Sequence, residues 1–164
     1  YNGAIADFTK AIEINPNDVD AYYNRGLSKA KLKDDYGAIA DYTKAIELDP
    51  NDADAYYSRG NSKYDLKDYN GAIADFTKAK EINPNYVGAY NNRGLSKNKL
   101  KDYYGAIADY TKAIELDPNN DDAYANRGVS KENLGDLNGA CVDWKKAAAL
   151  GNKIAAEWVA KQCN

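Results

Sequence analysis

Residues 19–52 read VDAYYNRGLSKAKLKDDYGAIADYTKAIELDPND, and this stretch decides the fold because its pattern recurs along the chain. Prolines recur every 34 residues, at Pro16, Pro50, Pro84 and Pro118. A fixed period of 34 residues is typical of repeat architectures, in which one small unit is stacked many times. The same spacing carries Arg25-Gly26, Arg59-Gly60, Arg93-Gly94 and Arg127-Gly128, and also Asp41, Asp75, Asp109 and Asp143. The sequence therefore predicts a tandem array.

Each unit contains two helical segments separated by a turn. In residues 19–52, apolar and small residues recur at three- and four-residue steps on both sides of the turn at residues 33–35, which is the period of an α-helix. Asp34 is placed to cap the second helix, and Gly26 and Ala38 are small enough to let the two helices approach closely. Pro50 ends the hairpin because proline cannot donate a hydrogen bond to the preceding turn. The unit is a helical hairpin.

A 34-residue hairpin with Tyr22-x-x-Arg25-Gly26, Ala38-x-x-x-Tyr42, Ala45 and Pro50 resembles the tetratricopeptide repeat. The resemblance implies an all-α fold, a right-handed α-solenoid of antiparallel helix hairpins. We expect a single array with the second helix of a truncated repeat at 1–18, full repeats at 19–52, 53–86 and 87–120, a last repeat at 121–151 and a C-terminal capping helix at 152–163.

The repeats depart from the family pattern at two positions, where arginine stands in place of a common leucine and lysine in place of a common aromatic residue. A buried guanidinium needs a partner, so we expect the arginines to pair with the row of aspartates across the helix packing. The lysines are Lys29, Lys63, Lys97 and Lys131, the arginines Arg25, Arg59, Arg93 and Arg127, and the aspartates Asp7, Asp41, Asp75, Asp109 and Asp143.

A longer period of two hairpins lies within the array. Residues 1–50 and 69–118 are identical at 44 of 50 positions, which indicates a duplicated 68-residue unit. Because the chain starts at Tyr1 in the middle of the pattern, we expect the parent array to extend upstream, and no targeting signal can be read. The six differences are Ile12/Lys80, Asp18/Tyr86, Asp20/Gly88, Tyr23/Asn91, Ala30/Asn98 and Asp35/Tyr103.

Composition excludes several function classes. The chain has no histidine, which excludes a histidine-dependent triad or zinc site. Its 25 acidic and 22 basic residues alternate along the helices, so we expect no nucleic-acid partner, and no apolar stretch approaches the roughly 20 residues that span a membrane. Helix capping accounts for the paired carboxylates Asp34-Asp35 and Asp121-Asp122. We expect no enzyme activity, cofactor or metal.

The family resemblance places the binding surface on the concave wall, which is lined by the first helix of each repeat. Asparagine can donate to and accept from a peptide backbone, while tyrosine supplies amphipathic contact area. We therefore predict a non-enzymatic scaffold that binds a partner protein or an extended peptide, with a structural spacer or self-assembling module as the alternative. The expected groove residues are Tyr23, Asn24, Leu27, Tyr57, Ser58, Asn61, Tyr64, Asn92, Leu95 and Asn126.

Some members of this family hold the C-terminal carboxylate of chaperones with lysine, asparagine and arginine. The positions that would need lysine or arginine here include Asp20, Asp54 and Asp122. Aspartates repel a carboxylate and favour a neutral or basic ligand. We therefore expect a partner that does not present an acidic C-terminus.

The two cysteines leave two alternatives open. If the helices that carry Cys141 and Cys163 are antiparallel about Gly151, their thiols lie at the same level and can form a disulfide, which would indicate an oxidising compartment. Otherwise Cys141 simply replaces the isoleucine of the other repeats and Cys163 is a free thiol. The sequence does not decide between these alternatives.

The two ends of the array are expected to differ. Ile154, Ala155, Trp158 and Val159 lie on one face of the capping helix, with Trp144 as the surface that receives it. The other end lacks a first helix, which leaves an apolar face unpaired and favours contact with another chain. The residues of this self-association face are Ile5, Phe8 and Ile12.

Overall fold

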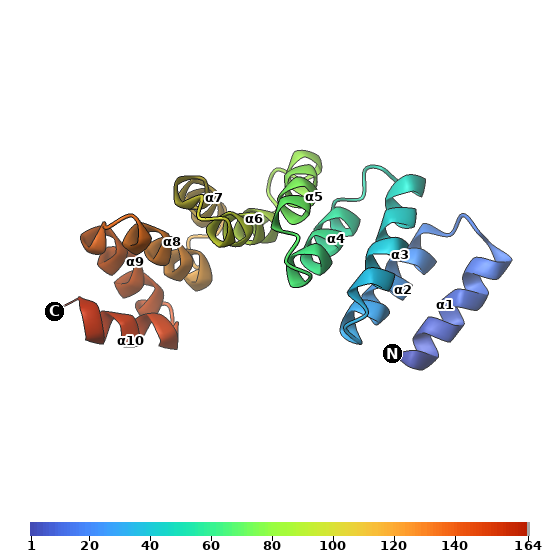
Figure 1. The fold of residues 1–164 in the computed structure, drawn as a ribbon, viewed down its shortest axis with the longest axis horizontal. Helices are drawn as coiled ribbons and strands as arrows, with labels where there is room; N and C mark the ends of the chain where they lie inside the picture. The colour runs from blue at the N-terminus through green and yellow to red at the C-terminus, as the bar shows by residue number, and fades with distance from the viewer. Residues whose placement is uncertain (164) are drawn as a thin grey trace. The chain divides into compact units, whose positions relative to one another are not determined.

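The computed structural model describes residues 1–163, and within this range it contains ten α-helices and no strand (Figure 1). Consecutive helices pack as hairpins, which confirms the predicted all-α fold. The helices are α1 (Asn2–Ile14), α2 (Val19–Lys31), α3 (Asp35–Leu48), α4 (Ala53–Asp65), α5 (Tyr69–Ile82), α6 (Val87–Lys99), α7 (Tyr103–Leu116), α8 (Asp121–Asn133), α9 (Leu137–Ala149) and α10 (Lys153–Gln162).

The chain forms two compact units, which meet in sequence between Pro84 and Asn85. Unit 1 contains α1 to α5, with the hairpins α2–α3 and α4–α5. Unit 2 contains the hairpins α6–α7 and α8–α9, and α10 packs against α9.

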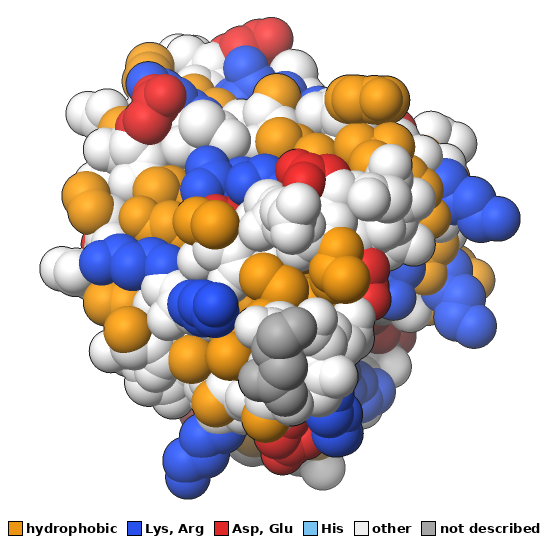
Figure 2. Space-filling view, turned by 90° about the vertical axis from the view of Figure 1, so that its left-hand side faces the viewer, with side chains coloured by type: hydrophobic (Ala, Val, Ile, Leu, Met, Phe, Trp, Pro, Cys, Tyr) orange, Lys and Arg blue, Asp and Glu red, His pale blue; other side chains and the backbone are white. Residues whose placement is uncertain are grey.

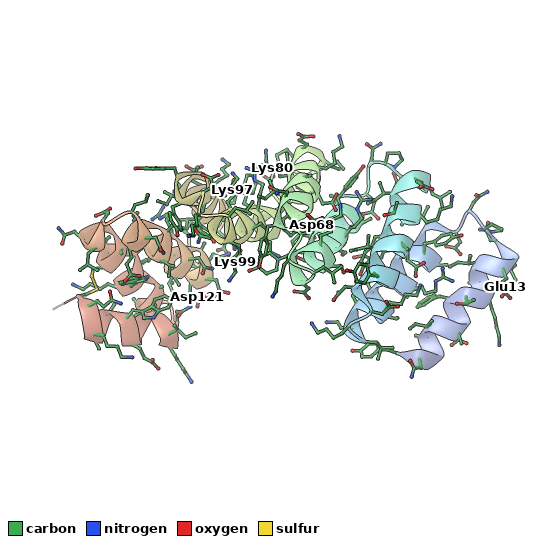
Figure 3. All side chains as sticks on the ribbon, viewed as in Figure 1. Glu13, Asp68, Lys80, Lys97, Lys99 and Asp121 are labelled. Atoms are coloured by element: carbon green, nitrogen blue, oxygen red, sulfur yellow. A yellow bond between two sulfur atoms is a disulfide. The ribbon has the colours of Figure 1, made fainter. Side chains whose placement is uncertain are left out.

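Helix starts are fixed by short polar side chains, as predicted. Asp34 accepts a hydrogen bond from the backbone N–H of Gly37 at 3.0 Å, and Asp68, which lies at the start of α5 in Figure 3, does the same with Gly71 at 2.9 Å. Such a side chain satisfies one of the N–H groups that a helix leaves unpaired at its start. Tyr86 precedes α6 without a side-chain cap, where the equivalent Asp18 caps α2.

Glycine allows the two helices of each hairpin to approach closely. A Cβ atom on Gly26 would stand 2.7 Å from Cε1 of Tyr42, and one on Gly60 would stand 2.7 Å from Cε1 of Phe76. Tyr42 and Phe76 are 1% and 0% exposed. The aromatic ring therefore occupies the space that a larger residue than glycine would fill, and the hairpin core is built on this contact.

The predicted arginine–aspartate pairs are present in all four hairpins. In the first, Nε and Nη2 of Arg25 donate to the two carboxylate oxygens of Asp41 at 2.9 and 2.7 Å. Lys29 also contacts this carboxylate, with its Nζ 2.8 Å from Oδ2. The same triad recurs as Arg59–Asp75–Lys63, Arg93–Asp109–Lys97 and Arg127–Asp143–Lys131.

The prediction is wrong for Asp7, which is exposed. Each paired aspartate lies on the second helix of a hairpin and its arginine on the first, and for Asp7 the matching arginine position would fall before Tyr1. The arginines also join neighbouring hairpins, since Nη1 of Arg25 donates to Thr9 of α1 at 3.2 Å. The triad therefore stabilises each hairpin, and in three of the hairpins its arginine also bonds a threonine of the preceding helix in the same unit.

The capping helix α10 packs on α9 through aromatic rings. The ring centroids of Trp144 and Trp158 are 5.3 Å apart, and Ala155 is fully buried, as predicted. Ile154 was expected on the same face, but it is 60% exposed, and the apolar cluster formed by Trp144, Ala155, Trp158 and Val159 does not include it. Asn152 donates to Asp121 of α8 at 3.1 Å, which lies near the start of α8 (Figure 3).

Candidate functional site

The predicted groove residues of unit 1 lie on its first helices, α2 and α4. All seven are partly exposed rather than buried or fully solvated. We call this surface the first-helix face of unit 1, defined by Tyr23, Asn24, Leu27, Tyr57, Ser58, Asn61 and Tyr64. In unit 2 the corresponding predicted residues Asn92 and Leu95 on α6 and Asn126 on α8 are also partly exposed.

The tyrosines of this face contribute to the structure as well as to the surface. Tyr23 packs against Tyr42 with ring centroids 5.8 Å apart, and its hydroxyl lies 3.3 Å from Oγ of Ser58, which links α2 to α4. Tyr57 packs against Phe76 with a centroid distance of 5.7 Å. Both rings therefore contribute to the packing of the fold while remaining partly exposed.

Asn24 is less available to a ligand than the sequence indicated. Its Nδ2 donates to the backbone carbonyl of Asp20 at 2.8 Å, one turn earlier in the same helix. The side-chain oxygen remains an acceptor. One of the two N–H donors of this asparagine is therefore used within its own helix.

Partial burial changes the acidity of the phenols on this face. Burial raises the pKa of Tyr23, and the carboxylates of Asp54 and Asp52 raise it further. Burial also raises the pKa of Tyr64. Because a raised pKa favours the protonated phenol, both hydroxyls are neutral hydrogen-bond donors at physiological pH.

A pocket of about 390 Å³ opens on this face of unit 1, and we call it the unit 1 pocket. Three predicted groove residues line it, namely Leu27, Ser58 and Asn61. The other lining residues come from the ends of α2 and α4 and from the second helix α3, and they were not among the predicted groove residues. The complete lining is Leu27, Ala30, Lys31, Lys33, Asp35, Tyr42, Ser58, Asn61, Ser62 and Asp65.

Unit 2 has a smaller pocket of about 240 Å³ at the same register of the duplicated sequence. We call it the unit 2 pocket. Its predicted lining residues are Leu95 and Asn126. The lining is Leu95, Asn98, Lys99, Tyr103, Asn126, Val129 and Asn133; Lys99 is labelled in Figure 3.

Asn98 organises the unit 2 pocket and was absent from the predicted set. Its Oδ1 accepts from Oγ of Ser130 at 2.9 Å, and its Nδ2 lies 3.3 Å from the hydroxyl of Tyr110. It therefore joins α6, α7 and α8 at the pocket wall. The signal in the sequence was the difference between Ala30 and Asn98, one of only six differences between the duplicated halves.

The remaining predicted positions lie away from these two pockets. In α1, Ile5, Phe8 and Ile12 are half-buried because α1 packs against α2. Of the two alternatives for the cysteines, the structure contains the disulfide between Cys141 and Cys163, drawn as the yellow bond in Figure 3. It joins α9 to the end of α10.

Other kinds of site find no support in the described residues. Within residues 1–163, no group of three or more histidine, cysteine, aspartate or glutamate side chains is arranged to hold a metal ion. None of the described helices combines the length and the apolar character that crossing a membrane requires. Figure 2 looks onto the face that carries the C-terminal helices, where basic, acidic and hydrophobic side chains are intermixed.

Family models match most of the chain. One described as tetratricopeptide repeat matches residues 53–86 and 87–120, one described as TPR repeat matches 1–33 and 34–66, and a further tetratricopeptide repeat model matches 109–141. A comparison with curated proteins found no match.

Several solved structures are similar to this chain. A crystal structure of MamA has 28% sequence identity and a TM-score of 0.89, and the match covers 94% of this chain and 91% of that one. The first TPR of Spaghetti (RPAP3), bound to the HSP90 peptide SRMEEVD, has 27% identity and a TM-score of 0.70, covering 71% of this chain and 93% of that one. The Arabidopsis OM64 TPR domain has 30% identity and a TM-score of 0.68, covering 70% and 94%.

Proposed function

Because the chain belongs to the tetratricopeptide repeat family, whose members generally mediate protein–protein interactions and are generally non-enzymatic, we propose that it is a non-enzymatic adaptor that binds an extended peptide or protein segment. The proposed repeats are 19–52, 53–86, 87–120 and 121–151, preceded by a partial repeat at 1–18 and followed by the capping helix at 152–163. The ligand lies on the first-helix faces.

One observation carries this proposal: each unit has a pocket at the same register of its first-helix face, and predicted groove residues line both. The two pockets combine an apolar wall with amide or hydroxyl groups, from Leu27, Ser58 and Asn61 in unit 1 and from Leu95 and Asn126 in unit 2. Peptide recognition needs this combination, because apolar surface gives affinity while a few polar groups fix orientation.

The charge of the face sets the class of peptide. Asp20, Asp54 and Asp122 are exposed on the first helices of three repeats, where they repel an acidic chain terminus and attract a basic one. The proposed partner is therefore neutral or basic, in contrast to the acidic peptide SRMEEVD bound in the similar RPAP3 domain.

Selection from a random peptide library on the purified chain tests this proposal. We expect selected peptides to be neutral or basic, and SRMEEVD to show no binding at concentrations that saturate them. Asn61→Ala should weaken binding of a selected peptide by about tenfold, the cost of about 1.4 kcal/mol from a lost polar contact. Asn70→Ala is the matched control, because Asn70 is exposed on the second helix α5. Equal losses in both variants, or selection of acidic peptides, would contradict the proposal.

Self-assembly is the second candidate function, and Phe8 is the observation that favours it. The equivalent rings of Tyr42, Phe76 and Tyr110 are at most 1% exposed, whereas Phe8 is only half-buried and α1 has no buried residue. Incomplete burial of an aromatic ring favours contact with a second chain. Sedimentation analysis of the wild type and Phe8→Ser across a range of concentrations tests this, and a monomer at every concentration would exclude it.

A further inference from the structure

The unit 1 pocket contains a carboxylate without a counter-ion. Asp35 lines the pocket and is 9% exposed, and within residues 1–163 its side chain forms no hydrogen bond or ion pair. The adjacent Asp34 makes the capping bond to Gly37, so capping accounts for Asp34 and not for Asp35. The oxygens of Asp35 are not among the fully buried atoms that lack a partner, so they remain accessible from the pocket. The helix dipole favours an acid in the first turn, but it would do so equally for an exposed one.

Asp35 is particular to this repeat. At the same register the other repeats carry Tyr1, Tyr69, Tyr103 and Leu137. The unit 2 pocket has Tyr103 in its wall and measures about 240 Å³, whereas the unit 1 pocket measures about 390 Å³. An aspartate at this position therefore coincides with a larger pocket and adds a carboxylate to its lining.

The rest of the lining matches a long cationic side chain. Leu27 and Ala30 offer apolar surface to a methylene stem, and Ser58 and Asn61 carry oxygens that can accept from its charged end. Tyr42 lines the same pocket as Asp35. The pocket therefore offers a carboxylate, polar acceptors and an apolar wall together.

The two lysines at the pocket do not neutralise this carboxylate. Lys33 has a partner of its own, since its Nζ lies 3.5 Å from Oδ2 of Asp65. Lys31 is exposed, and among the described residues it forms no ion pair. The carboxylate of Asp35 therefore remains without a cation within the chain.

We propose that the unit 1 pocket binds the cationic side chain of a lysine or arginine of the partner, with the carboxylate of Asp35 as its counter-ion. This inference rests on the proposed function and specifies the chemistry of one part of the ligand. The unit 2 pocket has no carboxylate in its lining, so it takes a neutral part of the ligand, bounded by Asn98, Asn126 and Asn133.

Titration of the whole chain with small side-chain analogues tests the pocket directly. The probes are n-butylguanidinium for arginine, n-butylammonium for lysine and n-butanol as the neutral control, followed by the backbone amide signals in two-dimensional NMR spectra. Saturable shifts are expected at Asp35, Ser58 and Asn61 with at least one cation and not with n-butanol. The signals of Leu95 and Asn126 in the unit 2 pocket serve as the internal control and should not respond. No saturable shift, or equal shifts with n-butanol, would overturn the proposal.

Variants at the carboxylate separate charge from shape. Asp35→Asn keeps the shape and should weaken binding of the cation at least about tenfold. Asp35→Tyr installs the residue of two other full repeats, so the hairpin should fold while the cation no longer binds. The reciprocal Tyr103→Asp should create a cation response in unit 2. Unchanged affinity in Asp35→Asn would refute the role of the carboxylate.

The alternative counter-ion for Asp35 is Lys31 of the same chain, if its side chain rotates into the pocket in solution. Lys31→Gln should change the affinity for the cation by less than about twofold, because an exposed lysine contributes little. A gain of about tenfold or more would instead identify Lys31 as the occupant and overturn the proposal. The two proposals can fail separately. If the cations bind but no library peptide is selected, the proposed adaptor function is wrong and the cation site stands. If peptides bind with the same affinity to the wild type and to Asp35→Asn, the cation site is wrong and the adaptor function stands.

Discussion

Removing one buried carboxylate tests whether the Arg–Asp–Lys triads hold the array together. In the α4–α5 hairpin, Asp75 is 5% exposed and bonds Arg59 at 2.9 and 2.7 Å, and it contacts Lys63 at 2.8 Å. Asp75→Asn keeps the size of the side chain, but it removes the charge and turns one acceptor into a donor that faces a cation. The variant therefore leaves two cations without their shared counter-ion.

The size of the loss follows from the burial of the two cations. Removing one member of a buried ion pair costs about 3–5 kcal/mol, because an uncompensated charge stays inside. Arg59 and Lys63 are 15% and 21% exposed, so water partly compensates them and the lower end of this range applies. We expect Asp75→Asn to lower the free energy of unfolding by about 3 kcal/mol.

Urea unfolding followed by far-ultraviolet circular dichroism measures this loss, and Asp7→Asn is the matched control. Asp7 occupies the same register on α1 but is exposed, so its substitution should change stability by less than about 0.5 kcal/mol. Because repeat proteins are stabilised by contacts between neighbours, faster hydrogen exchange should be concentrated in α4 and α5. A loss below about 1 kcal/mol in Asp75→Asn, or equal losses in both variants, would refute the reasoning.

Three further perturbations test the core, the disulfide and a buried phenol. Gly60→Ala should lower the free energy of unfolding by about 1–3 kcal/mol, because its Cβ would stand 2.7 Å from Phe76; a gain in urea resistance would contradict this. Reduction of the Cys141–Cys163 disulfide, which spans 22 residues, should remove about 3 kcal/mol, whereas the double serine variant should not respond to reductant. Burial raises the pKa of Tyr42 above the value of about 10 that it has in the unfolded chain. Between these two pKa values the unfolded chain binds fewer protons than the folded chain, so the free energy of unfolding falls as the pH rises through this range. Alkaline unfolding should therefore be less steep in Tyr42→Phe, and its absorbance titration should show one fewer tyrosine that ionises above the ordinary pKa.

The local rules of helix formation account for what the sequence predicted well. Caps, the stop at proline and the close approach at Gly26 depend on neighbouring residues or on one helix contact, so the period of the prolines was enough to place them. The arginine partners were predictable too, because a buried guanidinium has few partners to choose from. In this case the requirement of a buried arginine for a counter-ion was enough to predict its partner.

Other features depended on distances between side chains, which the 34-residue repeat of the sequence does not give. Lys29 stands where the family often has an aromatic residue, and only the structure shows that its stem reaches the carboxylate already bound by Arg25. The sequence identified Asp34 as the cap, and Gly37 does bond Asp34, but only the structure shows that the neighbouring Asp35 is 9% exposed and lines a pocket. The depth of a side chain and the direction of a hydrogen bond are set by packing in three dimensions, which explains why most of the lining of both pockets was missed.

The duplicated halves separate the residues that stabilise the hairpin from those that shape its surface. The triad Arg25–Asp41–Lys29 and the contact of Gly26 with Tyr42 recur unchanged in the second copy. These contacts lie between the two helices of a hairpin, so a change on the first-helix face leaves them intact. The differences at this face or its pocket are Asp20/Gly88, Tyr23/Asn91, Ala30/Asn98 and Asp35/Tyr103, four of the six.

The same contacts between the helices of a hairpin can therefore support two different surfaces with little change in stability. Asp35 in one copy and Tyr103 in the other change the charge of the pocket and coincide with a change in its volume, while the Arg–Asp–Lys triads of both copies keep the same pairing. If unit 1 binds a cation and unit 2 a neutral group, the two pockets select different chemical groups. Exchanging the two residues, as Asp35→Tyr with Tyr103→Asp, should then leave the free energy of unfolding nearly unchanged and move the binding of a cation from unit 1 to unit 2.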